Sequence, residues 1–334
     1  LCAGQGVLWA EAWSELLEFA EVANIPVMTT LTGKSAFPEN HSLSLGTGGY
    51  SCTGMVKHFM RRTDLVLGIG CSFTSSFLAV PIPSEATIIH STNYEVDLNK
   101  DVTCHHGILG DAKLVLRQLI DETRRQGGCS NKSVAAEIKK IKDEWFSEWM
   151  PRLTSNEEPI NPYRVVYELS QIVDRARAII THDSGNPRDQ LAPFWETLTP
   201  RGYIGWGKST QLGSSLGFAL GAKLAAPEKL VINFMGDTAF GMCGMDFETA
   251  VRENIPILTV LLNNEAMGGY DRYIPVASRK YRSRYLTGDY CKIAEGLGLM
   301  TERVTKTVEI VPALQRGLDI VESGHPALVE FSTR

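Results

Sequence analysis

The stretch GDTAFGMCGMDFETAVRENIPILTVLLNN, residues 236–264, contains the pattern that decides the fold. An apolar run, LVINFM, precedes it at 230–235, and a second apolar run, ILTVLL, occupies 257–262. The segment between the runs carries apolar residues that suit a helix buried on more than one side, namely Met242, Met245, Phe247, Ala250 and Val251. We therefore expect a strand, a tight turn, a helix and a second strand.

Asp237 and Asn264 each stand at the end of one of these apolar runs. In a right-handed crossover the two strands lie in one parallel sheet, so their carboxyl ends share an edge. A carboxylate and an amide oxygen suit Mg²⁺, which keeps further positions for water and phosphate oxygens. The N–H groups of residues 238–241, at the start of the helix, can hold a diphosphate. The residues alone thus predict a Mg²⁺–diphosphate site, and the alternative is an exposed Gly-Asp turn with an Asn-Asn loop.

Two long stretches resemble one known family. GD followed after a spacer by NN resembles the cofactor motif of thiamine-diphosphate-dependent enzymes, and LGSSLGFALGAKLAAPEKLVINFMGDTAF, 212–240, resembles the diphosphate-binding domain of acetolactate synthases and their relatives. IPVMTTLTGKSAFPENHSLSLGTGG, 25–49, is similar to the central domain of the same group. The resemblance implies two doubly wound parallel-sheet α/β domains, with thiamine diphosphate and Mg²⁺ as cofactors.

The alternation of strand and helix signals agrees with that fold class, because it is typical of parallel, doubly wound sheets. We expect a central α/β domain at 1–127 and a diphosphate- and Mg-binding domain at 163–334. Between them, 128–162 reads as a linker with a charged surface helix at 134–150. The expected strands of the first domain are 27–31, 64–70 and 86–91, and its expected helices include 11–23 and 113–125.

Composition excludes several classes of function. A chain of 334 residues can hold two ordinary domains, and a net charge of −5 gives no electrostatic reason to bind nucleic acid. No apolar stretch has the length of a membrane span, and no signal peptide is visible. The seven cysteines show no metal-ligand spacing, which favours reduced thiols in a cytoplasmic protein.

The glycine pairs Gly4-x-Gly6 and Gly68-x-Gly70 fall beside strand ends, but neither continues to the third glycine of a dinucleotide-binding GxGxxG motif. Tight strand-to-helix turns are the favoured interpretation. In the resembling family the central domain sometimes binds FAD or ADP. The stretch after Gly70, CSFTSSF at 71–77, has no charged residue, which makes FAD doubtful.

The resemblance also assigns site residues. Asp237, Asn264 and the backbone carbonyl of Ala266 are the expected metal ligands. Thr238 and Ala239 are expected to present N–H groups to the diphosphate. The full set of cofactor-binding residues expected from the resemblance is Gly185, Asn186, Leu212, Gly236, Thr238, Ala239 and Met267.

Two of these positions lie outside the metal motif. In HDSGN, 182–186, the Asn186 amide and the N–H groups near Gly185 suit phosphate oxygens, and an Asx-type turn that caps the next helix is a compatible alternative. His182 is interpreted as a structural histidine. Leu212 matches the bulky residue that, in the family, wedges between the two cofactor rings and forces a bent cofactor.

The segment after the metal motif is expected to line the substrate mouth. Tyr270, Arg272 and Tyr273 offer a cation and two phenols to an anionic substrate. Tyr273 stands where acetolactate synthases typically carry a tryptophan, which leaves the substrate open. The basic run SRKYRSRY, 278–285, fits either a solvated interface loop or an anionic substrate.

The family's pyrimidine-binding domain, which supplies a catalytic glutamate, does not match any part of this sequence. We expect the chain to be a fragment of a longer enzyme, or else to receive that domain from a separate chain. The expected function is acetolactate-synthase-like decarboxylation and carboligation of a 2-oxo acid in a homodimer or tetramer, with the isolated chain inactive. AFGMCGMDFET, 239–249, also resembles oxalyl-CoA decarboxylases and 2-hydroxyacyl-CoA lyases, which is one alternative. The other is a non-catalytic cofactor-binding fragment.

Overall fold

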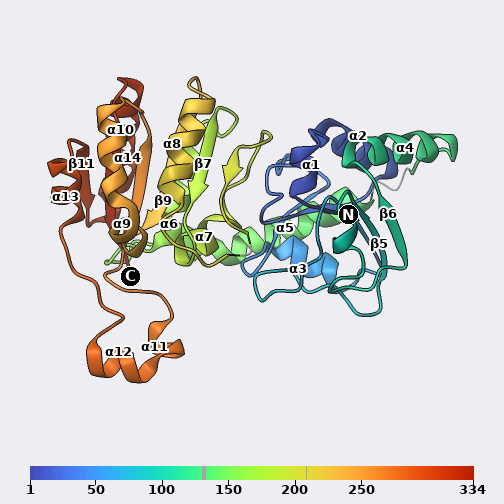
Figure 1. Ribbon diagram of the computed structural model, residues 1–334, viewed down its shortest axis with the longest axis horizontal. Helices are drawn as coiled ribbons and strands as arrows, with labels where there is room; N and C mark the ends of the chain where they lie inside the picture. The colour runs from blue at the N-terminus through green and yellow to red at the C-terminus, as the bar shows by residue number, and fades with distance from the viewer. Residues whose placement is uncertain (130–132, 208) are drawn as a thin grey trace. The chain divides into compact units, whose positions relative to one another are not determined.

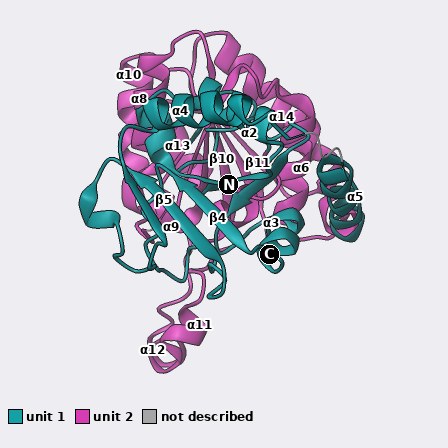
Figure 2. Ribbon diagram, turned by 90° about the vertical axis from the view of Figure 1, so that its right-hand side faces the viewer, with its two compact units in different colours: residues 1–149, 196–203 teal, residues 150–195, 204–334 magenta. Residues whose placement is uncertain are grey.

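The computed structural model describes residues 1–129, 133–207 and 209–334. These residues form two compact units, which Figure 2 shows in different colours. Unit 1 comprises Leu1–Trp149 and Glu196–Tyr203, and unit 2 comprises Met150–Trp195 and Ile204–Arg334. The predicted linker, 128–162, falls partly in each unit, and its residues 130–132 lie outside the described part of the chain.

Unit 1 is built on a six-stranded parallel sheet in the order β3-β2-β1-β4-β5-β6. Figure 1 shows α1, α2 and α4 on one side of this sheet and α3 and α5 on the other. This is the doubly wound α/β arrangement that the sequence predicts. The strands are β1 (Cys2–Ala3), β2 (Val27–Thr30), β3 (Ser44–Gly48), β4 (Leu65–Ile69), β5 (Thr87–Thr92) and β6 (His106–Leu109). The helices are α1 (Gln5–Trp9), α2 (Trp13–Ala23), α3 (Gly54–Met60), η1 (Glu95–Asp97), α4 (Ala112–Arg125) and α5 (Ser133–Leu153).

The two glycine pairs of unit 1 pack against each other. The Gly6 N–H donates to the Gly70 carbonyl at 2.8 Å. A Cβ added at Gly4 would lie 2.2 Å from the same carbonyl oxygen, so a side chain cannot be accommodated there. Gly70 itself has φ +61°, a conformation that favours glycine. Close backbone approach between two strand-to-helix turns therefore explains these pairs.

Residues 196–203 are held in unit 1 by a buried polar cluster. The Glu39 carboxylate accepts hydrogen bonds from the Thr197 N–H at 2.7 Å and from the Thr197 hydroxyl at 3.0 Å. The ammonium group of Lys34, itself 1% exposed, donates to Glu39 Oε1 at 2.7 Å. Thr47 donates to the same oxygen at 2.9 Å, so the buried charges are paired and hydrogen-bonded.

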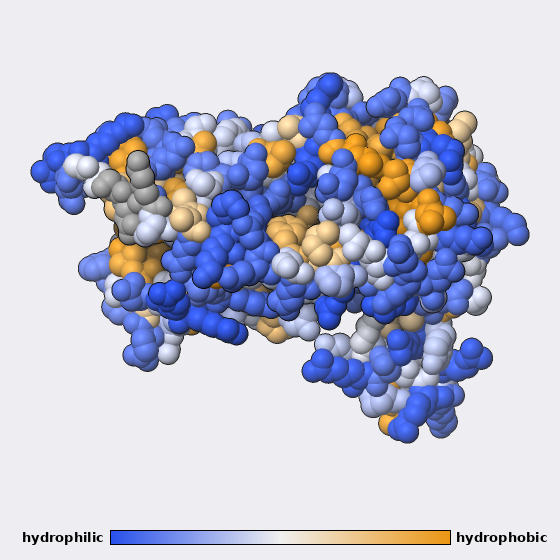
Figure 3. All heavy atoms as spheres, turned by 180° about the vertical axis from the view of Figure 1, so that it is seen from behind, coloured by the Kyte–Doolittle hydropathy of each residue, from blue (hydrophilic) through white to orange (hydrophobic). Residues whose placement is uncertain are grey.

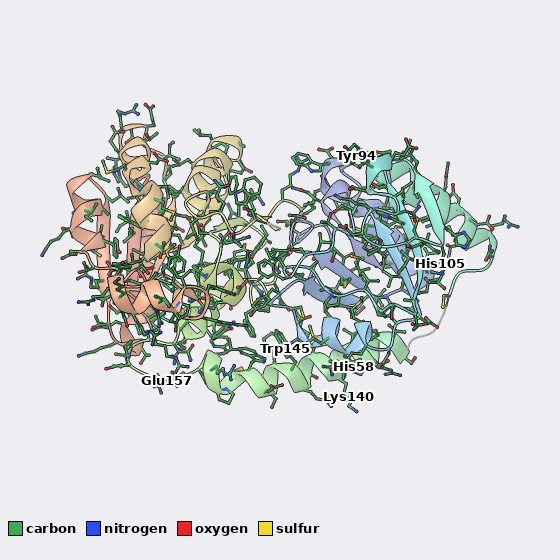
Figure 4. All side chains as sticks on the ribbon, turned by 60° about the horizontal axis from the view of Figure 1, so that its bottom comes forward. His58, Tyr94, His105, Lys140, Trp145 and Glu157 are labelled. Atoms are coloured by element: carbon green, nitrogen blue, oxygen red, sulfur yellow. The ribbon has the colours of Figure 1, made fainter. Side chains whose placement is uncertain are left out.

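Helix α5 packs beneath α3 in unit 1, as Figure 4 shows around Trp145 and His58. A Cβ added at Gly54 would lie 2.7 Å from Cδ1 of Trp145, so glycine permits this close packing. The Glu137 carboxylate contacts His58 Nε2 at 2.8 Å and Arg62 at 2.9 Å. The charged segment predicted at 134–150 is helical, and one of its charges, Glu137, pairs with His58 of α3.

Unit 2 contains a second six-stranded sheet, in the order β11-β12-β10-β9-β7-β8. The strands are β7 (Ala178–His182), β8 (Tyr203–Ile204), β9 (Leu230–Gly236), β10 (Leu258–Asn263), β11 (Met300–Val304) and β12 (Ala327–Ser332). The helices before β10 are α6 (Pro162–Ile172), α7 (Asn186–Leu191), α8 (Ser215–Ala225), α9 (Asp237–Cys243), η2 (Gly244–Asp246) and α10 (Phe247–Arg252). Those after β10 are α11 (Tyr270–Tyr273), α12 (Pro275–Tyr281), α13 (Tyr290–Gly296), η3 (Thr307–Glu309) and α14 (Ile310–Glu322).

Helices cover both faces of this sheet. On one face, buried residues of α8, α9, α10 and α13 form a single apolar cluster with β9 and β10. On the other face α14 packs closely, because a Cβ added at Gly317 would lie 2.8 Å from Leu258 and 3.0 Å from Val329. Unit 2 is therefore the second doubly wound α/β domain that the sequence predicts.

The helix predicted between β9 and β10 differs from the structure in one respect. It is divided into α9, the 3₁₀ turn η2 and α10, and Gly244 begins the turn. Met242 and Met245 are 58% and 69% exposed, so their predicted burial was wrong. Phe247 and Ala250 are fully buried, as expected. The break at Gly244 places Met245 in η2, outside both helices, whereas Met242 lies within α9 and is exposed there.

The segment of α11 and α12 projects from the rest of unit 2, at the lower left of Figure 1. Figure 3 shows the same projection from behind, with a mainly hydrophilic surface. Within residues 1–129, 133–207 and 209–334, no helix combines the length and apolar character that a membrane span requires.

Candidate functional site

Strands β9 and β10 are parallel neighbours whose carboxyl ends lie at the same edge, as the sequence predicts. Gly236 at the end of β9 is in register with Leu262 of β10. Asp237 comes directly after Gly236, so it lies level with Asn263, the last residue of β10. The chain after Asn263 continues as a loop, 264–269, that passes this edge and leads to α11.

The Asp237 side chain is buried at this edge, with 3% of the residue exposed. Its Oδ1 accepts the N–H of Thr238 at 2.7 Å, whereas its buried Oδ2 has no hydrogen-bond partner among the described residues. Burial raises the pKa of Asp237, and the nearby N–H groups of Thr238 and of residues 264–266 oppose that rise. The carboxylate is thus buried beside the loop with one oxygen still available, and a cation fits such a position.

The two adjacent asparagines have different environments. Asn263 is buried, and its amide makes hydrogen bonds at both ends: Nδ2 donates to Glu330 at 2.9 Å, and Oδ1 accepts the Glu265 N–H at 3.0 Å. Asn264 is partly exposed and starts the loop beside Asp237. The structure therefore leaves Asn264, and not Asn263, as the amide available to a metal.

The loop after Asn264 pairs with a second segment of unit 2. Ala266 forms an antiparallel bridge with Tyr285. The flanking hydrogen bonds run from the Met267 N–H to the Arg284 carbonyl at 2.7 Å and from the Leu286 N–H to the Glu265 carbonyl at 2.9 Å. Ala266 is thus in the non-hydrogen-bonded position of the pair, so its carbonyl is not used by this bridge.

Helix α9 begins at Asp237, immediately after β9. Gly236 precedes it in an extended conformation and provides no side-chain cap for the first turn. Thr238 and Ala239 stand in that first turn, where N–H groups have no backbone acceptor within the helix, and the Thr238 N–H donates to Oδ1 of Asp237 at 2.7 Å. Backbone donors at the start of a helix are what a diphosphate requires, and Gly236 places no side chain in front of them.

The end of β7 lies on the other side of β9 and approaches the same edge. Gly185 has φ +81° and caps α7, which starts at Asn186. A Cβ added at Gly268 would lie 3.6 Å from both side-chain polar atoms of Asn186, so this amide reaches the loop that follows β10. A Cβ added at Gly236 would similarly lie 3.3 Å from the ring of Pro187. The fold therefore brings the Gly185–Asn186 turn next to the loop 264–269.

Asp183 is a residue that the sequence reasoning missed. It is fully buried, and its carboxylate accepts the N–H of Gly213 at 3.0 Å. It also accepts the N–H and the hydroxyl of Ser215, at 3.2 and 2.8 Å. The only signal in the sequence was its position directly after a strand end, which many aspartates share. Its role depends on a contact with a segment far along the chain.

Leu212 lies directly before the segment that Asp183 fixes. Its side chain is partly buried against the apolar cluster of unit 2. Gly213 has φ +85°, and a Cβ added there would lie 3.2 Å from the Cβ of Met242 in α9. Leu212 is therefore placed beside α9, the helix that Asp237 begins.

The three predicted substrate residues lie together on α11. Arg272 and Tyr273 are exposed, and the guanidinium lies 5.7 Å from the Tyr273 ring centroid. Tyr270 is partly buried and follows Gly269, whose φ of +77° turns the chain into α11. The basic run that follows is also mostly exposed, and Arg284 pairs with Asp271 at 2.9 Å.

His182 ends β7 and is buried against Gly205, where a Cβ would lie 2.0 Å from Nε2. This close packing fits its interpretation as a structural histidine. Within the described residues, no three histidine, cysteine or acidic side chains are grouped to hold a metal. A carboxylate, an amide and a backbone carbonyl form a different set of donors, and it is a set that Mg²⁺ accepts.

Two family descriptions match the chain. Residues 1–119 match "Thiamine pyrophosphate enzyme, central domain", and residues 183–331 match "Thiamine pyrophosphate enzyme, C-terminal TPP binding domain". The second match begins at Asp183 and contains the whole edge described above.

Several curated proteins to which the chain is similar are named acetolactate synthase large subunits. The chain is 31% identical to a probable acetolactate synthase large subunit of Methanococcus aeolicus, over 99% of this chain and 57% of that protein. It is 30% identical to the corresponding protein of Methanocaldococcus jannaschii, over 99% of this chain and 56% of that protein. It is also 30% identical to the acetolactate synthase large subunit of Corynebacterium glutamicum, over 99% and 54% respectively. The chain thus spans about half the length of the curated relatives it matches.

Proposed function

Because the chain belongs to the thiamine pyrophosphate enzymes, we propose that unit 2 binds the diphosphate of thiamine diphosphate through Mg²⁺. The observation that carries this proposal is the buried Asp237 carboxylate, whose Oδ2 has no partner among the described residues. A divalent cation there would complete the coordination of that oxygen. It would also offset the cost of burying the charge.

The proposed ligands are Asp237, the side chain of Asn264 and the carbonyl of Ala266. Thr238 and Ala239 would donate N–H groups to the diphosphate from the first turn of α9, and Gly185 with Asn186 would contact it from the end of β7. Leu212 would support the two cofactor rings with an apolar surface, next to α9. Met267, one residue beyond Ala266, would contact the cofactor from the same loop.

The proposed activity is acetolactate-synthase-like: decarboxylation of a 2-oxo acid, followed by carboligation of the remaining fragment with an acceptor. When bound, thiamine diphosphate supplies the electron sink for this chemistry. The chain's own residues place the cofactor and exclude water. Tyr270, Arg272 and Tyr273 are the residues we propose for holding the anionic substrate.

We further propose that catalysis needs a pyrimidine-binding domain, in the same polypeptide or in a partner, and that the active form is a homodimer or tetramer. Support comes from the two matched family descriptions, which are those of a central and a C-terminal domain. The residue that acts on the pyrimidine ring is expected on that further domain. The cytoplasmic location remains a prediction.

The test is a product assay on the protein at its natural length, with Mg²⁺ and thiamine diphosphate. Pyruvate is offered as donor and acceptor, and oxalyl-CoA and a 2-hydroxyacyl-CoA are offered in parallel. We expect acetolactate from pyruvate and no turnover of the thioesters. Turnover of a thioester without acetolactate formation would replace the proposed substrate class by acyl-CoA compounds. No turnover of either class would contradict the proposed activity.

A further inference from the structure

The loop 264–269 carries the proposed ligands Asn264 and Ala266 and is called the metal loop below. Asn263 fixes the start of this loop although it is not itself a proposed ligand. Its Oδ1 accepts the N–H of Glu265, which has φ +53° in the left-handed region. A non-glycine residue adopts that conformation only when its surroundings stabilise it. The hydrogen bond to Asn263 is one such restraint, and the pairing of Glu265 with Leu286 is another. Asn264 and Ala266 flank Glu265 in the chain. The direction of the Asn264 side chain and that of the Ala266 carbonyl therefore depend on this turn.

Glu330 in turn fixes the amide of Asn263. It lies on β12 with 1% of the residue exposed, and its Oε1 accepts Nδ2 of Asn263 at 2.9 Å. The ionised carboxylate only accepts hydrogen bonds, so it selects the rotamer that points Nδ2 toward it. Oδ1 then faces the Glu265 N–H. The reverse orientation would place the amide oxygen against the carboxylate and the amide N–H against the Glu265 N–H.

The Glu330 carboxylate is itself held in place. Arg303 of β11 donates to both of its oxygens, at 3.1 and 3.2 Å, and the Cys291 thiol donates at 3.2 Å. Arg303 also pairs with Asp289 at 2.5 Å. A buried charge with these partners is rigid, because each donor would be left unsatisfied by a movement of the carboxylate.

We propose that Glu330 is a positioning residue of the metal site, which acts through Asn263 on the loop that carries Asn264 and Ala266. The inference rests on the proposed function, because it assumes that this loop binds Mg²⁺ with thiamine diphosphate. Glu330 does not touch the metal. Glu330 would act through hydrogen bonds that orient the groups around the ion, without binding the ion itself. Loss of such hydrogen-bonding residues commonly weakens metal binding 10- to 100-fold.

Glu330→Gln is the first variant, because it keeps the shape but places an amide where Arg303 and Cys291 donate. The matched control is Glu302→Gln, on the neighbouring strand β11. Glu302 pairs with Arg316 of α14 at 2.9 Å and makes no contact with Asn263. Each substitution removes one carboxylate that pairs with an arginine, and the two carboxylates belong to neighbouring strands of the same sheet. Only the first disturbs the acceptor that Asn263 uses, because a glutamine offers one acceptor oxygen to the donors of Asn263, Arg303 and Cys291 that now share two.

The experiment measures Mg²⁺ affinity by calorimetry at saturating thiamine diphosphate, below the unfolding transition of each variant. We expect Glu330→Gln to bind Mg²⁺ about 10- to 100-fold more weakly, and Glu302→Gln to bind as the wild type does. Asn263→Ala should show the same loss with the Glu330–Arg303 pair intact, and it carries the test if Glu330→Gln does not fold. The double variant should lose no more than either single one, because both interrupt one path.

Unchanged Mg²⁺ affinity in folded Glu330→Gln or Asn263→Ala, while the wild type binds, would overturn the positioning role and leave the proposed function standing. Additive losses in the double variant would also overturn it. A wild-type chain with no Mg²⁺-dependent binding of thiamine diphosphate would overturn the proposed function, and the positioning role with it.

Discussion

The carboxylate of Asp183 accepts two hydrogen bonds from Ser215, one from the backbone N–H at 3.2 Å and one from the hydroxyl at 2.8 Å. This contact joins the end of β7 to the start of α8. It also restrains the segment between them, which carries Leu212, and the turn after Asp183, which carries Gly185 and Asn186. One buried side chain therefore connects two of the proposed cofactor-binding segments.

Asp183→Ala should destabilise unit 2 by about 3 kcal/mol, because it leaves several buried donors without an acceptor. Urea unfolding followed by circular dichroism gives this free energy. The matched control is Asp174→Ala, since Asp174 accepts the Ala176 N–H at 3.0 Å in an exposed turn just before β7. We expect the control to lose less than about 1 kcal/mol. Equal losses in the two variants would contradict the assigned role of Asp183.

Asp237→Asn should stabilise the chain in the absence of metal and cofactor. Burial raises the pKa of Asp237, so folding disfavours its ionised form. Burial of the ionised carboxylate therefore lowers the free energy of unfolding. This loss is present in full at pH values above the pKa of Asp237 in the folded chain, and it disappears as the pH falls below the ordinary pKa of aspartate. The variant should therefore unfold at higher urea concentration than the wild type at pH 7, with a smaller difference at pH 4. A difference that grows toward pH 4 would show that the sign of the shift is wrong.

Much of this edge can be predicted from the sequence, for a physical reason. Two apolar runs joined by a segment of helical pattern specify a parallel β-α-β crossover, and that topology places Asp237 and Asn264 together. The structure confirms the parallel pairing of β9 and β10. What the pattern cannot show is the difference between adjacent asparagines. That difference comes from Glu330, a residue on another strand that buries and holds Asn263.

Asp183 and the two methionines illustrate the same limit. The role of Asp183 depends on the placement of Ser215, which only the tertiary structure defines. Met242 and Met245 have helical spacing, but both are exposed, the first within α9 and the second in η2. Apolar spacing alone does not show which face of a helix other elements cover.

The cysteines of unit 2 should resist alkylation. Burial raises the pKa of Cys291 to about 12, with a further contribution from Glu330. Burial likewise raises the pKa of Cys243 to about 12, and the charges of Asp183 and Asp246 make smaller contributions in the same direction. Only about one thiol in ten thousand is ionised four pH units below its pKa, and the thiolate is the nucleophile.

Iodoacetamide at pH 8, with mass spectrometry of the peptides over time, tests this expectation. Cys129 is exposed and should be alkylated first, while Cys243 and Cys291 remain unmodified in the native chain. In urea all three should react at similar rates. Rapid native alkylation of Cys243, which is only partly buried, would contradict the raised pKa.

The isolated chain should not accelerate proton exchange at the thiazolium carbon of thiamine diphosphate. The glutamate that acts on the pyrimidine ring is expected on a further domain, so this chain would bind the diphosphate without activating the ring. NMR in deuterated buffer measures the exchange, with free thiamine diphosphate and Mg²⁺ as the reference. Exchange well above that reference rate would mean that a residue of this chain performs the glutamate's role.

Calorimetric titration of the chain with thiamine diphosphate, with Mg²⁺ and then with EDTA, tests the metal–diphosphate site itself. The wild type should bind with Mg²⁺ and fail to bind with EDTA, because the diphosphate then lacks its neutralising ion. Asp237→Ala should abolish binding, whereas Asp246→Ala, at an exposed position of η2, should leave it intact. Equal affinity with and without metal, or unchanged affinity in Asp237→Ala, would contradict the assignment of Asp237 as a metal ligand.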